Sequence, residues 1–406
     1  MSLESEQAKN QKVGGLLLLF GILLIGSNLR APLTSVGSLV PIIRDTLGVS
    51  HTLIGTITTL PLLAFALVSP FAPKIANKLG MERTIFISMI ILVIGILLRS
   101  VTGVSTLFIG TAFIGIAISF GNVLIPGLVK MSFPFRIGAV TGLYAVFMNT
   151  FGALASGVSV PLSEATSYGW QGALAAWAIL AVVAMFVWFP QVKRPADLPN
   201  YDVDTQHEKT NMWSSLTAWQ VTVFMGLQSL MFYTVLTWLP EILQVNGYTA
   251  NEAGWMLSLM QFALIPVTFI MPIIATKVKD QKWLSVMTGL FFFVGTLGLI
   301  NGQQVIVIIA VILLGIACGS AFSLSMIFFT LRTKDAYAAS ELSGMAQSIG
   351  YLLAAFGPML FGGLHDIFNN WTAPLFLLLI CSGVILIAGV LAGRNIVINA
   401  PQRGRA

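Results

Sequence analysis

One arginine, Arg30, lies deep inside the first long apolar run of the chain, which begins near Gly14. A helix rises about 1.5 Å per residue, so this position falls near the middle of a bilayer core about 30 Å thick. A guanidinium at that depth costs about 2.5–3.5 kcal/mol even on lenient scales, and such a charge is typical of a ligand site or a wet cavity. The planar fork of arginine suits the paired oxygens of a carboxylate-like or nitro-like group.

Amide and phenol side chains near the middle of other apolar runs complete the candidate site. We expect substrate contacts from one shared set: Arg30, Asn122, Asn149, Gln228, Tyr233, Gln261, Gln347 and Tyr351. The third, sixth, ninth and twelfth runs have no comparable residue, as expected if one helix in each triplet faces lipid. The alternative for Asn149 and Gln261 is a hydrogen bond between helices, worth about 1 kcal/mol. Tyr144, Tyr233 and Tyr351 can equally be packing or interface residues.

No Asp or Glu lies near the middle of any apolar run. The nearest acids are Glu341 at the start of one run and Glu164, Glu241 and Asp366 at the ends of others. Proton relays and cation sites in transporters commonly use an intramembrane carboxylate. The predicted cavity therefore suits a small anion, or a neutral ring with hydrogen-bond acceptors, better than a cationic drug.

The composition excludes most other classes of protein. The 406 residues are 56% hydrophobic and 9% charged, whereas a soluble protein is about a quarter charged. The net charge of +6 does not indicate nucleic-acid binding, because the basic residues form no patch interleaved with aromatics. We find no P-loop, no Ser/His/Asp set and no metal-ligand cluster, so we predict no enzyme activity, no cofactor and no metal. We expect an all-α polytopic membrane protein that acts as a monomer in the lipid bilayer.

Hydropathy and loop residues divide the chain into twelve predicted spans. Their approximate bounds are 14–41, 51–73, 84–102, 105–129, 137–162, 171–192, 217–242, 250–274, 283–301, 304–330, 337–362 and 372–393. The fifth and eleventh spans resemble each other at 141–157 and 343–363, where a small residue and glycine precede an amide side chain and a further glycine. Repeats of this kind are common in transporters.

The charges and one polar segment give the orientation and the domains. Most of the 21 Lys and Arg fall in segments that are cytoplasmic if both termini are cytoplasmic, which is the positive-inside pattern. The proline-containing, charged segment 193–212 reads as a cytoplasmic linker. It separates a six-helix bundle, 1–192, from a pseudo-symmetric second bundle, 213–406. We expect a multi-pass protein of the plasma membrane.

The loop after the second span carries a family signature. Residues 70–83 read PFAPKIANKLGMER, which resembles a degenerate copy of the cytoplasmic loop motif of the major facilitator superfamily. Lys78 and Gly80 match that motif, Asn77 replaces its Asp, and Pro73 replaces its first Gly. We assign Asn77, Lys78, Gly80 and Arg83 to this gating loop, in which the Asp-based charge relay of the motif is missing.

Longer strings resemble one subfamily of that superfamily, the cyanate and 2-nitroimidazole transporters. They are NLRAPLTSVGSLVPIIRD (28–45), TLPLLAFALVSP (59–70), GNVLIPGLVK (121–130), WQGAL (170–174), TAWQVTVFMGLQSLMFY (217–233) and ELSGMAQSIGYLLAAFGP (341–358). The last string and VKDQ (278–281) are more similar to the nitroimidazole branch. The resemblance implies the major facilitator fold and alternating access to a central site, with a cyanate-like anion or a nitroimidazole-like compound as substrate.

Two functions stay open on the sequence. The first is secondary active or facilitative transport of a small solute around Arg30, and the alternative is an efflux antiporter for neutral organic compounds. The sequence does not choose the direction of transport or the coupling ion, for which H⁺ is a candidate.

Overall fold

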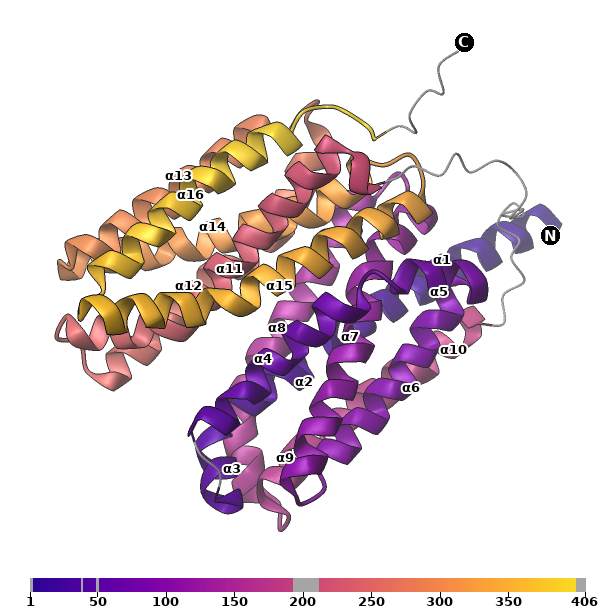
Figure 1. The fold of residues 1–406 in the computed structure, drawn as a ribbon. Helices are drawn as coiled ribbons and strands as arrows, with labels where there is room; N and C mark the ends of the chain where they lie inside the picture. The colour runs from indigo at the N-terminus through magenta and orange to yellow at the C-terminus, as the bar shows by residue number, and fades with distance from the viewer. Residues whose placement is uncertain (1–2, 38, 49–50, 193–211, 399–406) are drawn as a thin grey trace. The chain divides into compact units, whose positions relative to one another are not determined.

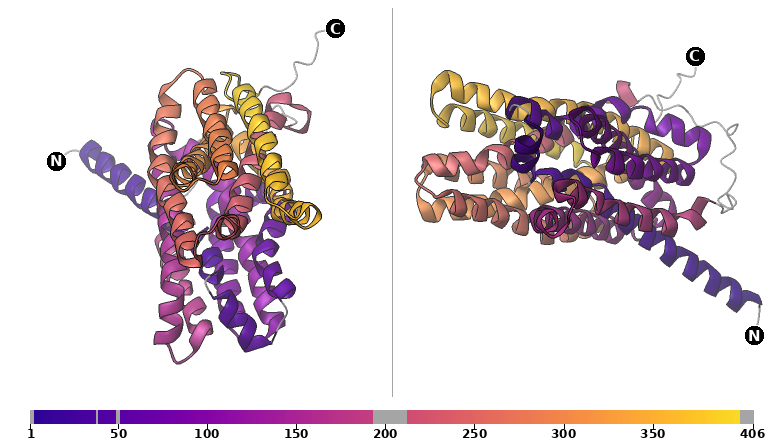
Figure 2. Two further views of the ribbon diagram at one scale, coloured as in Figure 1. Left: turned by 90° about the vertical axis from the view of Figure 1, so that its left-hand side faces the viewer. Right: turned by 90° about the horizontal axis from the view of Figure 1, so that it is seen from below.

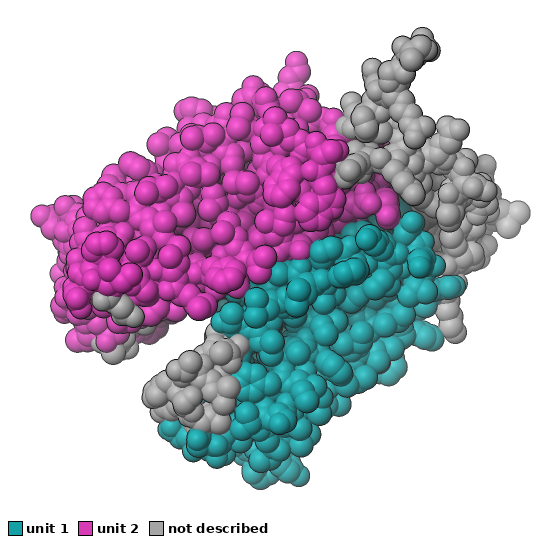
Figure 3. Space-filling view, in the orientation of Figure 1, with its two compact units in different colours: residues 1–134, 143–209 teal, residues 135–142, 210–406 magenta. Residues whose placement is uncertain are grey.

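The computed structural model describes residues 3–37, 39–48, 51–192 and 212–398, and within these every regular element is a helix. The chain forms two compact units (Figure 3). Unit 1 comprises Met1–Pro134 and Leu143–Lys209, and unit 2 comprises Phe135–Gly142 and Thr210–Ala406. Except for Met212, the predicted linker 193–212 lies outside the described residues.

The helices follow the apolar runs of the sequence (Figure 1). The first ten are α1 (Leu3–Asn28), α2 (Ala31–Gly37), α3 (Val40–Leu47), α4 (His51–Val68), α5 (Ala72–Leu79), α6 (Met81–Arg99), α7 (Val104–Ser132), α8 (Ile137–Ala165), α9 (Gly169–Ala175) and α10 (Trp177–Val192). After the short 3-10 helix η1 (Met212–Ser214) come α11 (Leu216–Val245), α12 (Ala250–Lys277), α13 (Lys282–Asn301), α14 (Gln304–Leu331), α15 (Ala336–Phe368) and α16 (Thr372–Ala392).

Among the described residues, 11 helical segments are long and apolar enough to cross a membrane, and one further pair is bent by 56°. Counting that pair, Thr59–Val68 with Ala72–Leu79, as one span gives up to 12. The predicted polytopic all-α class is therefore confirmed. Proline interrupts the helix in two of these spans.

The first span is broken at Arg30 and is not one continuous helix. Helix α1 ends at Asn28 and α2 starts at Ala31, and the Arg30 carbonyl accepts hydrogen bonds from the backbone N–H groups of Leu33 and Thr34, each at 3.0 Å. Pro32 has no N–H and cannot continue the ladder of α1. The turn places Arg30 at a helix end, inside the candidate span Gly15–Gly37.

The predicted loop 70–83 contains the helix α5. Pro70 ends α4 because the residue before a proline avoids the α conformation, and Pro73 is tolerated in the first turn of α5. Asn77 and Lys78 lie exposed on α5, and Arg83 lies exposed on α6. The whole motif thus forms a short amphipathic helix and the start of the next span.

Gly80 makes the sharp turn between α5 and α6 with φ 87° and ψ 148°. This conformation costs an L-residue with a side chain about 1–3 kcal/mol. We expect Gly80→Ala to lower the thermal unfolding midpoint of the purified protein. Gly383→Ala in α16, where a Cβ would meet nothing within 4 Å, is the matched control and should leave the midpoint unchanged. Equal midpoints for the two variants would contradict this assignment.

The two units pair their helices in the same pattern, which supports the predicted repeat. In unit 1, α7 packs on α4 and α6, and α10 packs on α1 and α6. In unit 2, α14 packs on α12 and α13, and α16 packs on α11 and α13. Figures 1 and 2 show α13 and α16 side by side along their length. When α1 is matched with α11, each of these four pairs in one unit has its counterpart in the other.

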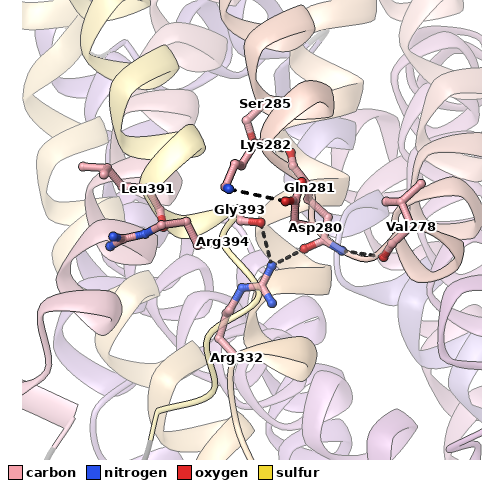
Figure 4. Close-up of polar contacts among 9 residues, drawn as sticks. All are labelled: Val278, Asp280, Gln281, Lys282, Ser285, Arg332, Leu391, Gly393 and Arg394. Atoms are coloured by element: carbon pink, nitrogen blue, oxygen red, sulfur yellow. Dashed lines mark hydrogen bonds and ion pairs between the residues drawn. The ribbon is translucent and has the colours of Figure 1, made fainter.

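A buried arginine joins three helix ends of unit 2 (Figure 4). Arg332 follows α14, is 1% exposed, and donates to the Gln281 side-chain oxygen, to Ala392 O at 2.7 Å and to Gly393 O at 3.2 Å. The Gln281 backbone N–H donates to Gly393 O at 2.8 Å. Burial lowers the pKa of Arg332 to about 10, so the guanidinium stays charged at neutral pH.

We expect Arg332→Met to destabilise the protein by about 2–3 kcal/mol, since it leaves buried acceptors without their charged donor. The measurement is thermal or denaturant unfolding of the purified protein in detergent. Lys334→Met removes an exposed cation two residues away and should change stability little. If the two variants unfold alike, Arg332 does not hold these helix ends together.

Candidate functional site

The stem of Arg30 lies directly against the backbone of α8. A Cβ added at Gly152 would come within 2.6 Å of Arg30 Cγ, so the stem occupies the space that any side chain at this position would fill. The Thr34 hydroxyl, one turn beyond Arg30, donates to Gly152 O at 2.7 Å. Gly152 therefore holds both the stem of the half-buried Arg30 and the start of α2 in place.

A second contact of the same kind holds α1 on α8. A Cβ at Gly26 would lie 2.6 Å from Tyr144 Cδ2, which shows that the tyrosine ring rests on the glycine. Tyr144 is 2% exposed and lies on α8, the helix whose Gly152 contacts the Arg30 stem. The structure thus adds Tyr144 to the surroundings of Arg30 and also gives its ring the packing role that the sequence left open.

The asparagines of unit 1 differ in their roles. Half-buried Asn122 follows Gly121, where α7 meets the Leu29 side chain beside Arg30. Asn149 Nδ2 donates to Ala145 O of its own helix at 2.8 Å. Asn28 is fully buried, and its Nδ2 joins α1 to α10 through Leu180 O at 3.3 Å. Asn122 thus lies next in sequence to Gly121, which contacts Leu29 in the turn between α1 and α2.

In unit 2 the polar candidates gather where α11 crosses α15. A Cβ at Gly226 would lie 3.1 Å from Gly350 Cα, and a Cβ at Gly350 would lie 3.1 Å from Gly226 Cα. Gln228 follows Gly226 by two residues, and Gln347 and Tyr351 flank Gly350. The close approach of the two backbones brings these three side chains to one level of the unit.

Neighbouring side chains orient both glutamines. Gln228 Nε2 donates to Ser229 Oγ at 2.8 Å and to Met225 Sδ at 3.1 Å, and Gln347 Nε2 donates to Ser343 Oγ at 2.8 Å. The two residues are 3% and 0% exposed. Their amide groups are therefore fixed by local partners within unit 2.

The remaining candidates are less closely connected to that crossing. Tyr233 is half-buried and packs edge to face on Phe232, with ring centroids 5.2 Å apart. Gln261 is half-buried in α12, and none of the described contacts brings it to the Gly226–Gly350 crossing. Across the part of the chain that the structure describes, no group of three or more His, Cys, Asp or Glu could hold a metal ion.

A sequence profile of the Major Facilitator Superfamily matches residues 16–353 and 221–406, which together include nearly the whole chain. The chain belongs to the major facilitator superfamily.

Curated members of the superfamily place it more narrowly. The chain is 43% identical to the uncharacterized transporter YycB of Bacillus subtilis, with 98% of each chain covered. It is 40% identical to the 2-nitroimidazole transporter of Escherichia coli over 94% of this chain and 96% of the relative. It is 27% identical to the cyanate transport protein CynX of Escherichia coli, over 87% and 91%. The predicted position nearer to the nitroimidazole branch is confirmed.

Solved structures of the superfamily share the fold. The proton:xylose symporter XylE, bound to 6-bromo-6-deoxy-D-glucose, superposes with a TM-score of 0.73 at 14% identity, over 95% of this chain and 96% of that one. The protein is thus a multi-pass membrane transporter of the major facilitator type and not an enzyme, as predicted.

Sequence reasoning missed two residues of unit 1 that the structure makes prominent. Arg99, the last residue of α6, is 1% exposed, and its Nη1 donates to Pro32 O at 2.7 Å. Gly152 is the further glycine of the repeat in the fifth predicted span, but its contact with Arg30 was not predicted. The signal for Arg99 was a cation at the end of an apolar run, and the signal for Gly152 was the glycine that the two repeats share.

Proposed function

We propose that the protein transports a small solute with an anionic or nitro-like head, by alternating access around a midplane site that contains Arg30. The observation that carries this proposal is the Arg30 stem packed on Gly152 at the break between α1 and α2. A guanidinium on such a base is preorganised, so binding costs little side-chain entropy. The proposed partners are Asn122, Asn149, Gln228, Tyr233, Gln261, Gln347 and Tyr351.

The chemistry of the guanidinium sets the class of substrate. Its N–H groups form parallel pairs that match two oxygens of a planar head, as in a carboxylate or a nitro group. Two relatives, one named for 2-nitroimidazole and one for cyanate, support a small, acceptor-rich solute. No Asp or Glu lies near the middle of any predicted apolar run, which disfavours a cationic drug.

We propose the plasma membrane as the location, with both termini cytoplasmic. The distribution of Lys and Arg supports this orientation through the positive-inside rule. We further propose that the protein acts as a monomer. In this mechanism the first bundle, 1–192, and the second, 213–406, rock about the site. A reporter that is active only in the cytoplasm, fused to the C-terminus, tests the orientation.

Direction and coupling follow from two further measurements on this carrier. Uptake into proteoliposomes that responds to an imposed pH gradient supports H⁺ as the coupling ion. Increased sensitivity of a deletion strain to nitroimidazoles supports the alternative, efflux of neutral organic compounds, whereas unchanged sensitivity disfavours export.

The test of the proposed function is a thermal-shift panel of small anions and nitroheterocycles on the purified protein. A ligand at 100 times its dissociation constant stabilises the folded state by about 2.7 kcal/mol. We expect at least one such compound to stabilise the wild type and not Arg30→Ala. The proposal fails if no compound stabilises the wild type, or if Arg30→Ala responds equally.

A further inference from the structure

Arg99 is a second buried cation in unit 1, and it is not part of the site around Arg30. It is the last residue of α6 and is 1% exposed. Its backbone is packed against α7, where a Cβ at Gly110 would lie 2.7 Å from Arg99 Cα. The side chain has little freedom to leave this position, because the helix that carries it is fixed at the glycine.

The hydrogen bonds of Arg99 are incomplete on one edge. Nη1 donates to Pro32 O at 2.7 Å, while Nε and Nη2 are buried without a hydrogen-bond partner among the described residues. Nε and Nη2 carry the N–H bonds that run parallel along one edge of the guanidinium, the edge that binds a planar oxyanion bidentately. Arginine does not lose its proton in proteins, so this edge of the guanidinium stays positively charged although its N–H groups have no acceptor.

A further donor without a partner lies close by. Trp170 in α9 is 2% exposed, and its Nε1 has no hydrogen-bond partner within the described part of the chain. Trp170 belongs to the same buried hydrophobic cluster as Val36 and Leu107. Val36 lies one turn beyond Pro32, the residue that Arg99 contacts, and Leu107 lies one turn before Gly110. Arg99 and Trp170 therefore meet the same short stretches of α2 and α7, and α6 packs on α9.

Several buried donors with a net positive charge and no acceptor are unfavourable unless a ligand supplies the acceptors. We infer that Arg99 Nε and Nη2, with Trp170 Nε1, form a second binding site in unit 1 that takes a small planar oxyanion, such as a carboxylate-like or nitrate-like ion. Val101 and Thr102, which closely follow this end of α6, are exposed. The site is independent of the function proposed for Arg30.

The probe is formate. The reference is the full-length Arg30→Ala protein, because formate cannot bind to the Arg30 side chain in this variant. The protein is purified in detergent, and sodium formate replaces sodium HEPES at constant ionic strength. We expect the thermal unfolding midpoint to rise by several degrees and to saturate with formate concentration. Failure of the function proposed for Arg30 would leave this result unchanged.

Two further substitutions in the same background assign the site. Arg99→Lys keeps the positive charge but loses the two-donor edge, and Trp170→Phe keeps an aromatic ring but loses the donor. We expect the half-saturating formate concentration to rise at least tenfold with the first and at least threefold with the second. The inference is overturned if the reference shows no saturable rise, or if either variant keeps the half-saturating concentration of the reference.

Discussion

Replacing Arg30 by alanine is expected to reduce transport about a hundredfold or more while the protein still inserts and folds. Two hydrogen bonds from a charged group contribute about 1.5–3 kcal/mol each, and 1.4 kcal/mol corresponds to a factor of ten. Arg30→Lys keeps the charge but loses the planar fork, so weak transport should persist. The measurement is initial-rate uptake of labelled substrate into proteoliposomes that contain equal amounts of each variant.

Two controls separate a lost contact from a lost fold. The variants should elute as the wild type in size-exclusion chromatography and should reconstitute to the same level. Near-normal transport by Arg30→Ala would remove Arg30 from the substrate site and refute the proposed mechanism.

Gly152→Ala is expected to lower transport at least tenfold although it adds only one methyl group. The new Cβ would lie 2.6 Å from Arg30 Cγ, so the arginine stem must move away from its base. A shift of about 1 Å at a positioned group can cost a hundredfold in rate. Gly157→Ala, on the same helix, adds the same methyl where nothing lies within 4 Å, and it should transport normally.

The double variant shows whether Gly152 acts through Arg30. Contacting residues give non-additive effects, so Gly152→Ala should cause little further loss once Arg30 is alanine. Equal transport by Gly152→Ala and Gly157→Ala would show that the arginine stem moves freely, and additive losses would show that Gly152 acts on transport by another route.

Apolar run length was sufficient to predict the transmembrane helices, because lipid demands long segments with all backbone groups paired. It did not predict the break at Arg30 or helix α5. Hydropathy is insensitive to Pro32, which removes one N–H while leaving the run apolar. In the same way Pro70 and Pro73 divide a run and start an amphipathic helix, which hydropathy alone reads as a loop.

The sequence proposes Arg30 because a charge and a membrane-depth position coincide there, and its role at the site stays a prediction. Polar residue type alone was less informative, because the amides of Asn28 and Asn149 donate to backbone carbonyls. The packing contacts that α8 makes with the first span around Arg30 were not predictable from the sequence. Gly152 and Tyr144 reach Arg30 through the packing of α8 on the first span, and that contact depends on tertiary structure.

The central claim is that Arg30 binds the oxygens of the solute's head group, and a comparison of paired ligands tests it most directly. Binding of 2-nitroimidazole and of 2-chloroimidazole, which is also unprotonated at neutral pH but lacks the nitro oxygens, is measured calorimetrically on the wild type and on Arg30→Ala. We predict that the wild type prefers the nitro compound at least tenfold and that Arg30→Ala binds both compounds with similar, weak affinity. A full nitro preference retained by Arg30→Ala would contradict the claim.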